Sequence, residues 1–528
     1  MMFSLAGTGN LKAIMVHYVG GCLLALAAGC SKQPPARPAA HSGATETVAV
    51  PRIWEEKQLA AWATPVAGLN VRPGFYSEAE YYAARVDNLR TYPVFHPAHE
   101  PKGYRDWLRA QGPRPLIEPE KLKTKADWVQ AGRRVFEELD TEVARTDDPM
   151  VIGHFSNAAA VDKYRDASHD AMTREGILLD YRWVVERDGS LKISLSSCSG
   201  CHTRLMPDGS LLPGGPSNFD LADSPAARAL LARFYPTPPP SEGERFYQSF
   251  GVPWRADDVH ARFRTNRDDQ VLQFYDLETG APAGTTFARF NGSPLFTTRM
   301  ADLNGVKDRR YLDSTGTHAN RGPEDIARYG ILVEFADDGV FGPHRMTPEL
   351  NQQLRVRPPD EAMYALGLYV YSLEPPRSPE PFDQLARRGQ RIFQAEGCGA
   401  CHPAPTYTNN KLVPAPGFEP PRDPASERLS ISTRRVGTDP GLALRTRKGT
   451  GYYRVPSLRG LWYRGLFEHS GSVASLEEWF DSRRLRDDYV PTGWKGPGVK
   501  SRAVPGHEFG LDLPDADKRA LIAFLKTL

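Results

Sequence analysis

Two five-residue stretches decide the fold of this chain: CSGCH at residues 198–202 and CGACH at residues 398–402. In each stretch two cysteines are separated by two residues and followed directly by a histidine, which is the attachment pattern of a c-type haem. The two thiols can form thioethers to the vinyl groups of one porphyrin, and the histidine can bind the iron as proximal ligand. The sequence therefore predicts two covalent haems, one on Cys198, Cys201 and His202 and the other on Cys398, Cys401 and His402.

Zinc sites and redox-active dithiols also use a Cys-x-x-Cys pair. A zinc site needs a second pair close by, whereas these pairs stand 200 residues apart (398 − 198 = 200). A thioredoxin-type dithiol requires a βαβ context, and the flanking sequence shows none. Both motifs therefore favour haem over the alternatives.

The start of the chain indicates export. Residues 13–29 form an apolar run of about 17 residues, the length of a signal-peptide core rather than a transmembrane span. The run ends in LAAGC, which resembles a bacterial lipoprotein cleavage site. We expect a lipoprotein-type signal peptide over residues 1–30, with Cys30 lipidated, and a flexible linker over residues 31–50. An ordinary cleaved signal or an uncleaved anchor stays open as an alternative.

Export agrees with the haem prediction, because c-type haems are attached outside the cytoplasm. We therefore expect the protein in the periplasm or at the cell surface, anchored to the outer membrane by the lipid on Cys30. Only Cys22 and Cys30 lie outside the two motifs, so no cysteine pair remains for a structural disulfide in the mature chain. A net charge of +2 argues against nucleic acid as a partner.

The sequence repeats itself at three places. The matching segments are residues 130–136 (QAGRRVF) with 388–393 (RGQRIF), residues 303–316 with 458–471, and residues 365–373 (ALGLYVYSL) with 520–528 (ALIAFLKTL). The first and third pairs carry apolar residues at helical spacing and predict a helix before each haem motif and another that closes each half.

This repeat predicts a mainly α fold with two tandem cytochrome-c-like haem domains and large loop insertions. A small β-hairpin is expected in the first domain over residues 181–195, around the turn residues Asp188 and Gly189. The predicted parts are an N-terminal extension over residues 51–120, an N-terminal haem domain over 121–375 and a C-terminal haem domain over 376–528. The Pro-rich residues 375–381 form the expected linker between the halves.

Residues 454–460 (RVPSLRG) and 467–478 (FEHSGSVASLEE) follow the second motif. Together with the two tandem motifs, they resemble the bacterial dihaem cytochrome c peroxidase superfamily, which includes the methylamine-dehydrogenase maturation enzyme and rubber-oxygenase-like branches. The resemblance covers roughly residues 125–528. It implies that the N-terminal haem is the reactive centre, with an open site for peroxide or oxygen. It also implies that the C-terminal haem is six-coordinate and passes electrons.

The resemblance implies a distal ligand for the C-terminal haem. No methionine follows Met363, so this half cannot supply the methionine ligand found in typical members of the superfamily. His507 lies in the loop before the last helix, where the family places its sixth ligand, and His469 is the rival candidate. Ligation by two histidines gives a lower potential than ligation by methionine and histidine, because a thioether favours ferrous iron.

The resemblance also implies a catalytic carboxylate at the N-terminal haem. Family members carry it in a Val-Glu-Met segment that follows a Trp-Asp-Gly segment. Here Leu312 and Asp313 occupy the Trp-Asp position, and Val333, Glu334 and Phe335 follow. Glu334 is thus the candidate to take a proton from one peroxide oxygen and return it to the leaving hydroxyl, with a pKa raised by desolvation. An ordinary charged residue on a helix or strand edge is the alternative.

Some residues depart from the family pattern. Leu312 replaces the tryptophan that bridges the haems in the family, with Tyr311 beside it, and residues 288–291 (ARFN) stand where an inhibitory distal histidine is usual. An open first iron that needs no reductive activation is the expectation. Candidates for an apolar pocket are Phe287, Phe290 and Phe296, and lesser distal candidates are His260, Met300, His318 and His344. A calcium ion between the domains is a further family expectation, although the acidic pairs at 257–258 and 337–338 are expected to be solvated turns.

Three functions remain as hypotheses. The first is a peroxidase-like dihaem oxidoreductase that reduces peroxide at the N-terminal haem with electrons passed through the C-terminal haem. The second is a dihaem oxygenase that uses O₂ on an apolar substrate, as in the rubber-oxygenase branch. The third is a plain electron-transfer cytochrome. The expected electron donor is a small redox protein or a quinol-linked cytochrome.

Overall fold

The computed structural model describes residues 48–140, 142–168, 172–218, 252–255, 285–286, 297–335, 339–345, 354–496 and 499–528. Residues 46–528 group into one compact unit. Several predictions fall outside the described residues: the signal peptide with Cys22 and Cys30, the ARFN segment at 288–291, Phe287, Phe290, Phe296, His260, and the acidic pairs at 257–258 and 337–338.

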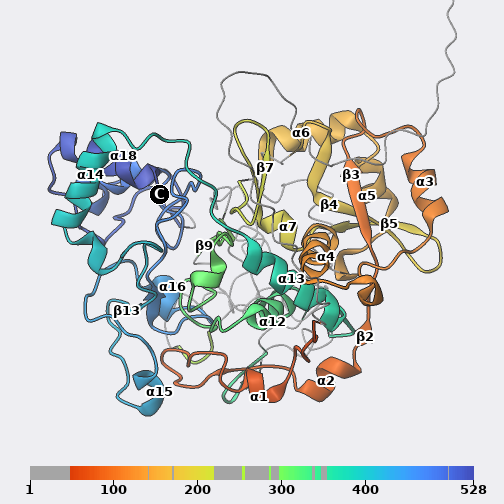
Figure 1. The fold of residues 1–528 in the computed structure, drawn as a ribbon, viewed down its shortest axis with the longest axis horizontal. Coiled ribbons are helices and arrows are strands. Elements are labelled where there is room, and N and C mark those ends of the chain that lie inside the picture. The colour runs from red at the N-terminus through yellow and green to blue at the C-terminus, as the bar shows by residue number, and fades with distance from the viewer. Residues whose placement is uncertain are drawn as a thin grey trace, which may run out of the picture. The chain divides into compact units, whose positions relative to one another are not determined.

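Helices contain more of the described residues than strands do (Figure 1). They are α1 (Glu56–Leu59), α2 (Glu78–Ala83), α3 (Tyr104–Gln111), α4 (Lys125–Glu138), α5 (Pro149–His154), α6 (Ala158–Ser168), α7 (Cys198–Cys201), α12 (Pro323–Glu334), α13 (Asp360–Ser372), α14 (Gln384–Ala395), α15 (Pro424–Glu427), α16 (Gly441–Leu444), α17 (Leu476–Trp479) and α18 (Asp515–Lys526).

The strands are short and form several small sheets. They are β1 (Pro73–Gly74), β2 (Arg85–Val86), β3 (Thr91–Phe95), β4 (Ile177–Val185), β5 (Leu191–Leu195), β6 (Thr203–Leu205), β7 (Leu211–Pro213), β8 (Thr285–Thr286), β9 (Thr298–Arg299), β10 (Val340–Phe341), β11 (His344–Arg345), β12 (Val356–Arg357), β13 (Leu412–Pro414) and β14 (Tyr452–Arg454).

Two helix pairs frame the two motifs: α4 packs against α13, and α14 packs against α18 (Figure 1). Their ends follow from local sequence. Helix α4 begins with a capping box between Thr124 and Asp127, and the Asp383 side chain caps α14 by accepting from the Ala386 N–H. Helices α13 and α18 carry acidic residues in their first turns, which complement the helix dipole. The four helices predicted from the repeated segments are confirmed.

A glycine brings the two backbones together in each helix pair. A Cβ atom on Gly132 of α4 would lie 1.9 Å from the carbonyl oxygen of Ala365. A Cβ atom on Gly389 of α14 would likewise lie 1.9 Å from the carbonyl oxygen of Ala520. In both pairs the carbonyl carbon of the same alanine follows at 2.5 Å and an aromatic Cβ at 2.8 Å, from Tyr369 and from Phe524. The two halves therefore share one helix-crossing geometry.

We expect Gly389→Ala to lower the free energy of unfolding by about 3 kcal/mol, because the new methyl group forces α14 and α18 apart. Thermal denaturation followed by circular dichroism measures the change. Gly153→Ala in α5 is the matched control, since no atom lies within 4 Å of its ideal Cβ position. Equal stability of the Gly389→Ala variant and the parent would show that the two backbones do not touch at this crossing.

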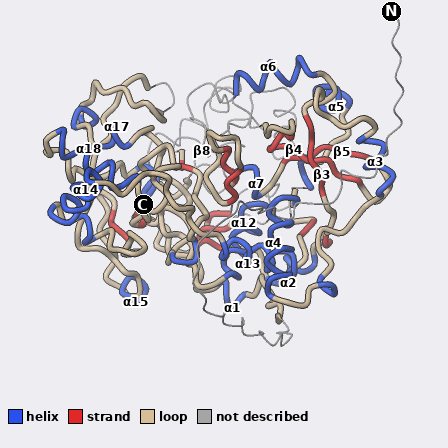
Figure 2. The backbone as a smooth tube through the Cα atoms, turned by 45° about the horizontal axis from the view of Figure 1, so that its top comes forward, coloured by secondary structure: helices blue, strands red, loops and turns tan. Residues whose placement is uncertain are grey.

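The predicted hairpin is confirmed and belongs to a three-stranded antiparallel sheet with the order β3-β4-β5 (Figure 2). In the register of β4 and β5, Tyr181 pairs with Leu195 and Val185 with Leu191. Gly189 adopts φ 81° in the turn, a conformation that glycine reaches without steric cost. The third strand, β3, comes from the N-terminal extension, and no sequence pattern had indicated it.

The N-terminal extension over residues 51–120 pairs and packs with later segments of the first half of the chain. Strand β1 pairs with β10, and β2 pairs with β12. Ile53, Trp54 and Trp62 belong to the same apolar core as helices α4, α12 and α13. The extension therefore shares the core on which the first motif rests. The predicted domain boundaries at residues 120 and 375 stay predictions.

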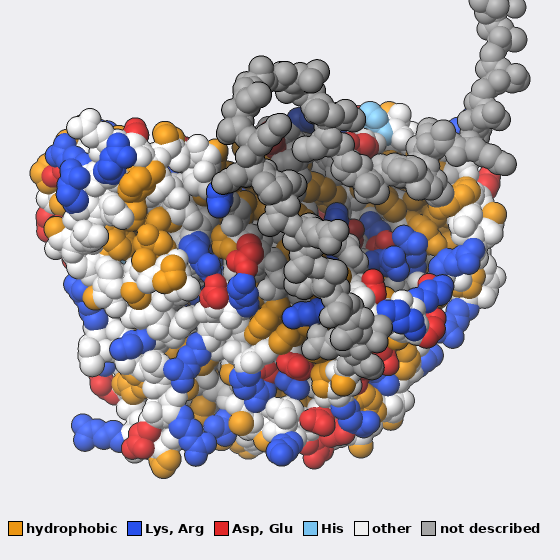
Figure 3. All heavy atoms as spheres, viewed as in Figure 1, with side chains coloured by type: hydrophobic (Ala, Val, Ile, Leu, Met, Phe, Trp, Pro, Cys, Tyr) orange, Lys and Arg blue, Asp and Glu red, His pale blue; other side chains and the backbone are white. Residues whose placement is uncertain are grey.

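Basic and acidic side chains are interspersed with apolar ones on the face that Figure 3 shows. Within the described ranges, none of the helices has both the length and the apolar character required to cross a membrane.

Candidate haem-binding sites

Each motif is a single helical turn that closes on its own histidine. The backbone N–H of His202 donates to the carbonyl oxygen of Cys198 at 3.0 Å, and that of His402 donates to Cys398 at 2.9 Å. A single turn places the two thiols and the imidazole of each motif close together. The four cysteines of the motifs form no disulfide.

The proximal imidazoles are oriented in the same way in both halves. Nδ1 of His202 lies 2.9 Å from the carbonyl oxygen of Ala301, and Nδ1 of His402 lies 3.0 Å from that of Tyr407. A carbonyl oxygen only accepts, so each Nδ1 carries the proton and each Nε2 keeps its lone pair for a metal ion. Burial lowers the pKa of His402, which keeps its ring in the neutral form that binds a metal.

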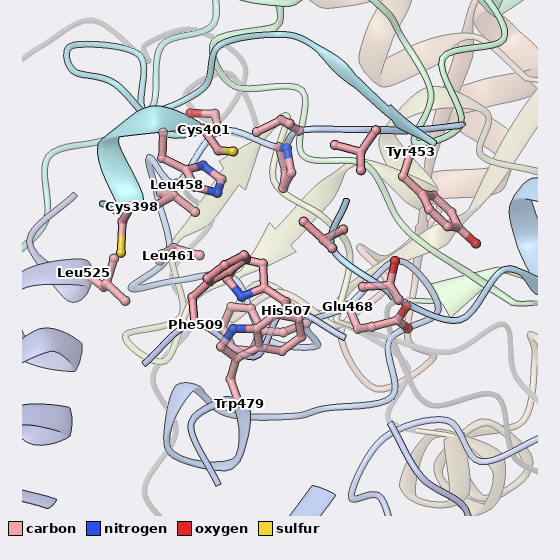
Figure 4. Close-up of a pocket in the computed structure, with 18 of the residues that line it drawn as sticks. Cys398, Cys401, Tyr453, Leu458, Leu461, Glu468, Trp479, His507, Phe509 and Leu525 are labelled. Carbon is pink, nitrogen blue, oxygen red and sulfur yellow. The ribbon is translucent and has the colours of Figure 1, made fainter. Parts of the chain in front are cut away.

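A deep apolar cavity adjoins the second motif. Its volume is about 230 Å³. Its lining includes the motif residues Cys398, Cys401 and His402 and the apolar residues Leu458, Leu461, Phe467, Leu476, Phe480, Leu521 and Leu525. Figure 4 shows Cys398 and Cys401 on one wall, with His507, Trp479 and Phe509 across from them.

The ring centroids of His402 and His507 lie 6.4 Å apart, with 55° between the ring planes. An imidazole nitrogen lies about 2.0 Å from its metal ion and about 1.1 Å from its own ring centroid, given ring bonds of about 1.35 Å. Two imidazoles on opposite sides of one ion should therefore have centroids about 6.2 Å apart. The observed spacing fits an iron ion between His402 and His507, so the residues present fit a bis-histidine haem.

The loop that carries His507 is held in place by a buried arginine. His507 has φ 48°, a left-handed conformation that is costly for a residue with a side chain. The guanidinium of Arg484, which has no solvent exposure, donates to the carbonyl oxygens of Val504, Gly506 and His507 at 2.6, 2.8 and 3.0 Å. Burial, with a smaller effect from His402, lowers the pKa of His507 to about 3. The His507 ring is therefore neutral, as a metal ligand must be.

His469 lines the same cavity but is engaged by other groups. Its ring stacks on Tyr453 with centroids 4.2 Å apart, and its Nε2 lies 2.9 Å from the carbonyl oxygen of Asp439. It also pairs with the carboxylate of Glu468. Burial alone would raise the pKa of Glu468, but His469 and the hydrogen bonds from Ser470 lower it to about 2. The geometry favours His507 over His469 as the residue facing His402.

One extended segment, residues 297–305, reaches from the first motif to the cavity of the second. The carbonyl oxygen of Ala301 contacts His202, as described above, while the N–H of Arg299 donates to the carbonyl oxygen of His469 at 3.0 Å. Met300 lies between these two contacts in the chain, and its role as a distal candidate stays a prediction.

His318 is fully buried beside Asp313. Its Nδ1 lies 2.9 Å from the Asp313 carboxylate, and its ring packs on Trp62 of the N-terminal extension with centroids 4.5 Å apart. Burial alone would raise the pKa of Asp313, but the hydrogen bond and charge of His318 lower it. The extension thus packs against the segment that contains Leu312 and Asp313. This contact gives residues 51–120 a structural role.

Glu334 and His344 lie within the described residues, but neither belongs to a group of side chains there that could hold a metal ion. Glu334 is the last residue of α12, and its side chain is partly buried. The ring of His344 lies 5.7 Å from that of Trp254. Among the described residues, no group of three or more His, Cys, Asp or Glu side chains could hold a metal ion. The roles of Glu334 and of calcium stay predictions.

Several residues of the site were not found from the sequence. Arg484 gives no signal, because a buried arginine in a loop has no periodicity to mark it. The carbonyl groups of Ala301 and Tyr407 that orient the two histidines cannot be identified from residue type. Arg454 could have been noticed, since it interrupts an apolar segment (YYRV, residues 452–455), and the structure places it in the lining of the cavity at the second motif.

No protein-family model matches the chain. Cytochrome-c peroxidase IdrP1 of Denitromonas iodatirespirans is 26% identical over 197 residues, which cover 32% of this chain and 49% of that protein. Methylamine utilization protein MauG of Methylorubrum extorquens is 26% identical over 147 residues, covering 27% of this chain and 34% of that protein. The chain thus spans half or less of the length of these two relatives.

Two solved structures also match in part. Hydrazine synthase of Kuenenia stuttgartiensis, pressurised with xenon, is 16% identical with a TM-score of 0.27, covering 55% of this chain and 89% of that one. A MauG-like protein associated with microbial copper homeostasis is also 16% identical with a TM-score of 0.27, covering 44% of this chain and 73% of that one. Similarity at this level carries no inference about function.

Repeated helix pairs, two Cys-x-x-Cys-His turns and an imidazole facing one of them resemble the arrangement of a haem protein of the cytochrome c class. The two relatives support haem as the cofactor. They also confirm the resemblance of this chain to the bacterial dihaem cytochrome c peroxidase superfamily.

Proposed function

We propose that this protein is a dihaem c-type oxidoreductase that reduces peroxide at the haem of the first motif with electrons delivered through the haem of the second. The observation that carries the proposal is the imidazole of His507, which faces His402 with 6.4 Å between the ring centroids, as the resemblance implies for the haem that passes electrons. A six-coordinate haem iron passes electrons, whereas a haem iron with a vacant coordination site can bind an oxygen atom of a substrate. One of the two relatives bears the name of a peroxidase.

The proposed ligand sets follow from the geometry of the histidines. Cys198 and Cys201 would hold the first haem and His202 its iron. Cys398 and Cys401 would hold the second haem, with His402 and His507 on its iron. A haem held by these residues would supply the electrons for reduction and a coordination site for peroxide.

Glu334 is the proposed acid and base of the reaction. Reduction of one peroxide molecule to two waters consumes two electrons and two protons. A carboxylate beside the peroxide can take the proton from one oxygen and deliver it to the other, which leaves as water. This shuttle requires no second titratable group, because the same carboxylate acts first as base and then as acid.

The segment of residues 297–305 is the proposed connection between the two haem sites. It hydrogen-bonds to His202 at one end and to the backbone of His469 at the other. Its central residues are fixed by the Asp302 carboxylate, which accepts from the Tyr463 hydroxyl at 2.7 Å and from the N–H of Asn304 at 3.1 Å. A rigid covalent path of a few residues suits electron transfer between the sites.

The proposed setting is the periplasm or the cell surface, with a lipid anchor on Cys30. The proposed donor is a small redox protein or a quinol-linked cytochrome. Both proposals rest on the sequence of residues 1–30 and on the resemblance.

Electron paramagnetic resonance of the oxidised protein tests the proposed function. We expect one high-spin and one low-spin ferric signal of equal intensity, together with consumption of hydrogen peroxide when a reduced donor is supplied. Two low-spin signals that cyanide does not change would indicate a plain electron carrier instead. Uptake of O₂ with cleavage of an apolar substrate, without peroxide turnover, would indicate an oxygenase.

A further inference from the structure

Four arginines gather between the two motifs. Arg299 lies on β9, Arg454 on β14, Arg464 in the loop before the FEHSG segment, and Arg309 directly after the 3₁₀ turn at Val306–Asp308. Arg309 and Arg464 are almost completely buried, with exposed fractions of 9% and 8%. Arg299, Arg454 and Arg464 line the cavity of the second motif.

These guanidinium groups donate only to backbone carbonyl oxygens in the described part of the chain. The acceptors are Leu466 for Arg299 at 3.3 Å, Asp313 for Arg454 at 3.4 Å, Ser457 for Arg464 at 2.8 Å, and Asp302 and Asn304 for Arg309. A guanidinium has five N–H donors, so each arginine can donate further hydrogen bonds to a group in the cavity. The Nε of Arg464 is buried and has no hydrogen-bond partner.

The carboxylates near the cluster interact with residues outside it. The closest approach is between Asp302 and the Nε of Arg464 at 3.8 Å, but the Asp302 carboxylate accepts from Tyr463 and Asn304. Asp313 and Glu468 are bound by their own histidines. Among the described residues, the cluster therefore gathers four positive charges around one carboxylate in ion-pair contact, that of Asp302 beside Arg464.

This arrangement is electrostatically unfavourable as it stands. Burial, together with repulsion from the neighbouring arginines, lowers the pKa of Arg454 to about 9 and that of Arg299 to about 10. Buried cations are retained where an anion compensates them. A carboxylate matches the planar fork of a guanidinium and can accept two hydrogen bonds from it.

We propose that Arg299, Arg454 and Arg464 bind the propionate carboxylates of the haem in this cavity, with Arg309 adding positive charge behind them. This inference rests on the proposed function, since it requires a haem on Cys398 and Cys401. The propionates are the charged groups of the porphyrin, and much of the remaining lining is apolar. The charged edge of a bound porphyrin would then face β9, the strand that leads to Ala301, whose carbonyl oxygen contacts His202.

The midpoint potential of the low-spin haem tests this assignment. Removal of a positive charge beside the porphyrin favours ferric iron. We expect Arg464→Gln to reduce the equilibrium constant for reduction at least tenfold, a shift of about 59 mV to more negative potential for one electron. Arg464→Lys should keep most of the parent potential because it keeps the charge. Arg435→Gln is the matched control, since Arg435 pairs with Glu419 at the exposed surface.

Spectroelectrochemical titration gives the potential, and the pyridine haemochrome gives the haem content of the same samples. An unchanged potential in Arg464→Gln with two haems per chain would overturn the assignment, as would equal shifts in the Gln and Lys variants. Should Arg464→Gln fail to accumulate, Arg454→Gln carries the same expectation and is judged in the same way. Absence of covalent haem from the parent protein would instead overturn the proposed function, so the two failures are distinguishable.

Discussion

Replacement of His507 by alanine is expected to convert the haem of the second motif from low-spin to high-spin ferric iron. The imidazole of His507 is placed to complete the coordination of the iron opposite His402, and alanine leaves that position to water. The resonance spectrum should lose its low-spin signal and gain a second high-spin one. Added imidazole should restore the low-spin signal, because the loop that Arg484 holds leaves room for a free ring.

Two variants serve as controls for this result. His507→Met should stay low-spin and shift the potential upward, since a thioether favours ferrous iron. His469→Ala should stay low-spin, because its Nε2 is bound to the Asp439 carbonyl oxygen. A low-spin signal that survives His507→Ala and disappears in His469→Ala would reverse the ligand assignment.

Replacement of Glu334 by glutamine should lower the rate of peroxide reduction by about 10²–10⁴-fold. Glutamine keeps the shape of the side chain but can neither accept nor return a proton. Stopped-flow measurement of the first reaction of the protein with hydrogen peroxide reports this step directly. Haem content and both ferric signals should be unchanged, since Glu334 is not proposed to bind iron.

Glu324→Gln is the matched control for this experiment, because Glu324 lies in the first turn of the same helix α12. Its peroxide reaction should proceed at the parent rate. Should Glu334→Gln also react at the parent rate, proton transfer belongs to another residue and the proposed role of Glu334 is wrong.

The sequence was informative where a pattern has a local physical cause. Cysteine and histidine spacing identified the motifs, because thioether and iron bonds require that spacing. The apolar periodicity of residues 130–136 and 388–393 predicted helices α4 and α14, which form as expected. The signal in residues 181–195 predicted a hairpin for the same reason.

The sequence was uninformative where a feature depends on segments that meet only in the folded chain. The carbonyl oxygen of Ala301 orients His202 across a long sequence separation, and any residue type could supply it. Arg484 reaches three carbonyl groups of a loop that follows it in the chain, and no local pattern foretells that contact. Pairing of β3 with β4 likewise depends on tertiary contacts of the N-terminal extension.

The central claim is that each Cys-x-x-Cys-His turn carries its own covalently attached haem. Acid-acetone extraction of the purified protein, followed by the pyridine haemochrome assay on the precipitated polypeptide, tests this claim most directly. We predict that two haems per chain stay with the polypeptide, and that one remains when Cys398 and Cys401 are both replaced by serine. Pigment that passes entirely into the acetone, or a polypeptide without haem absorbance, would contradict the account.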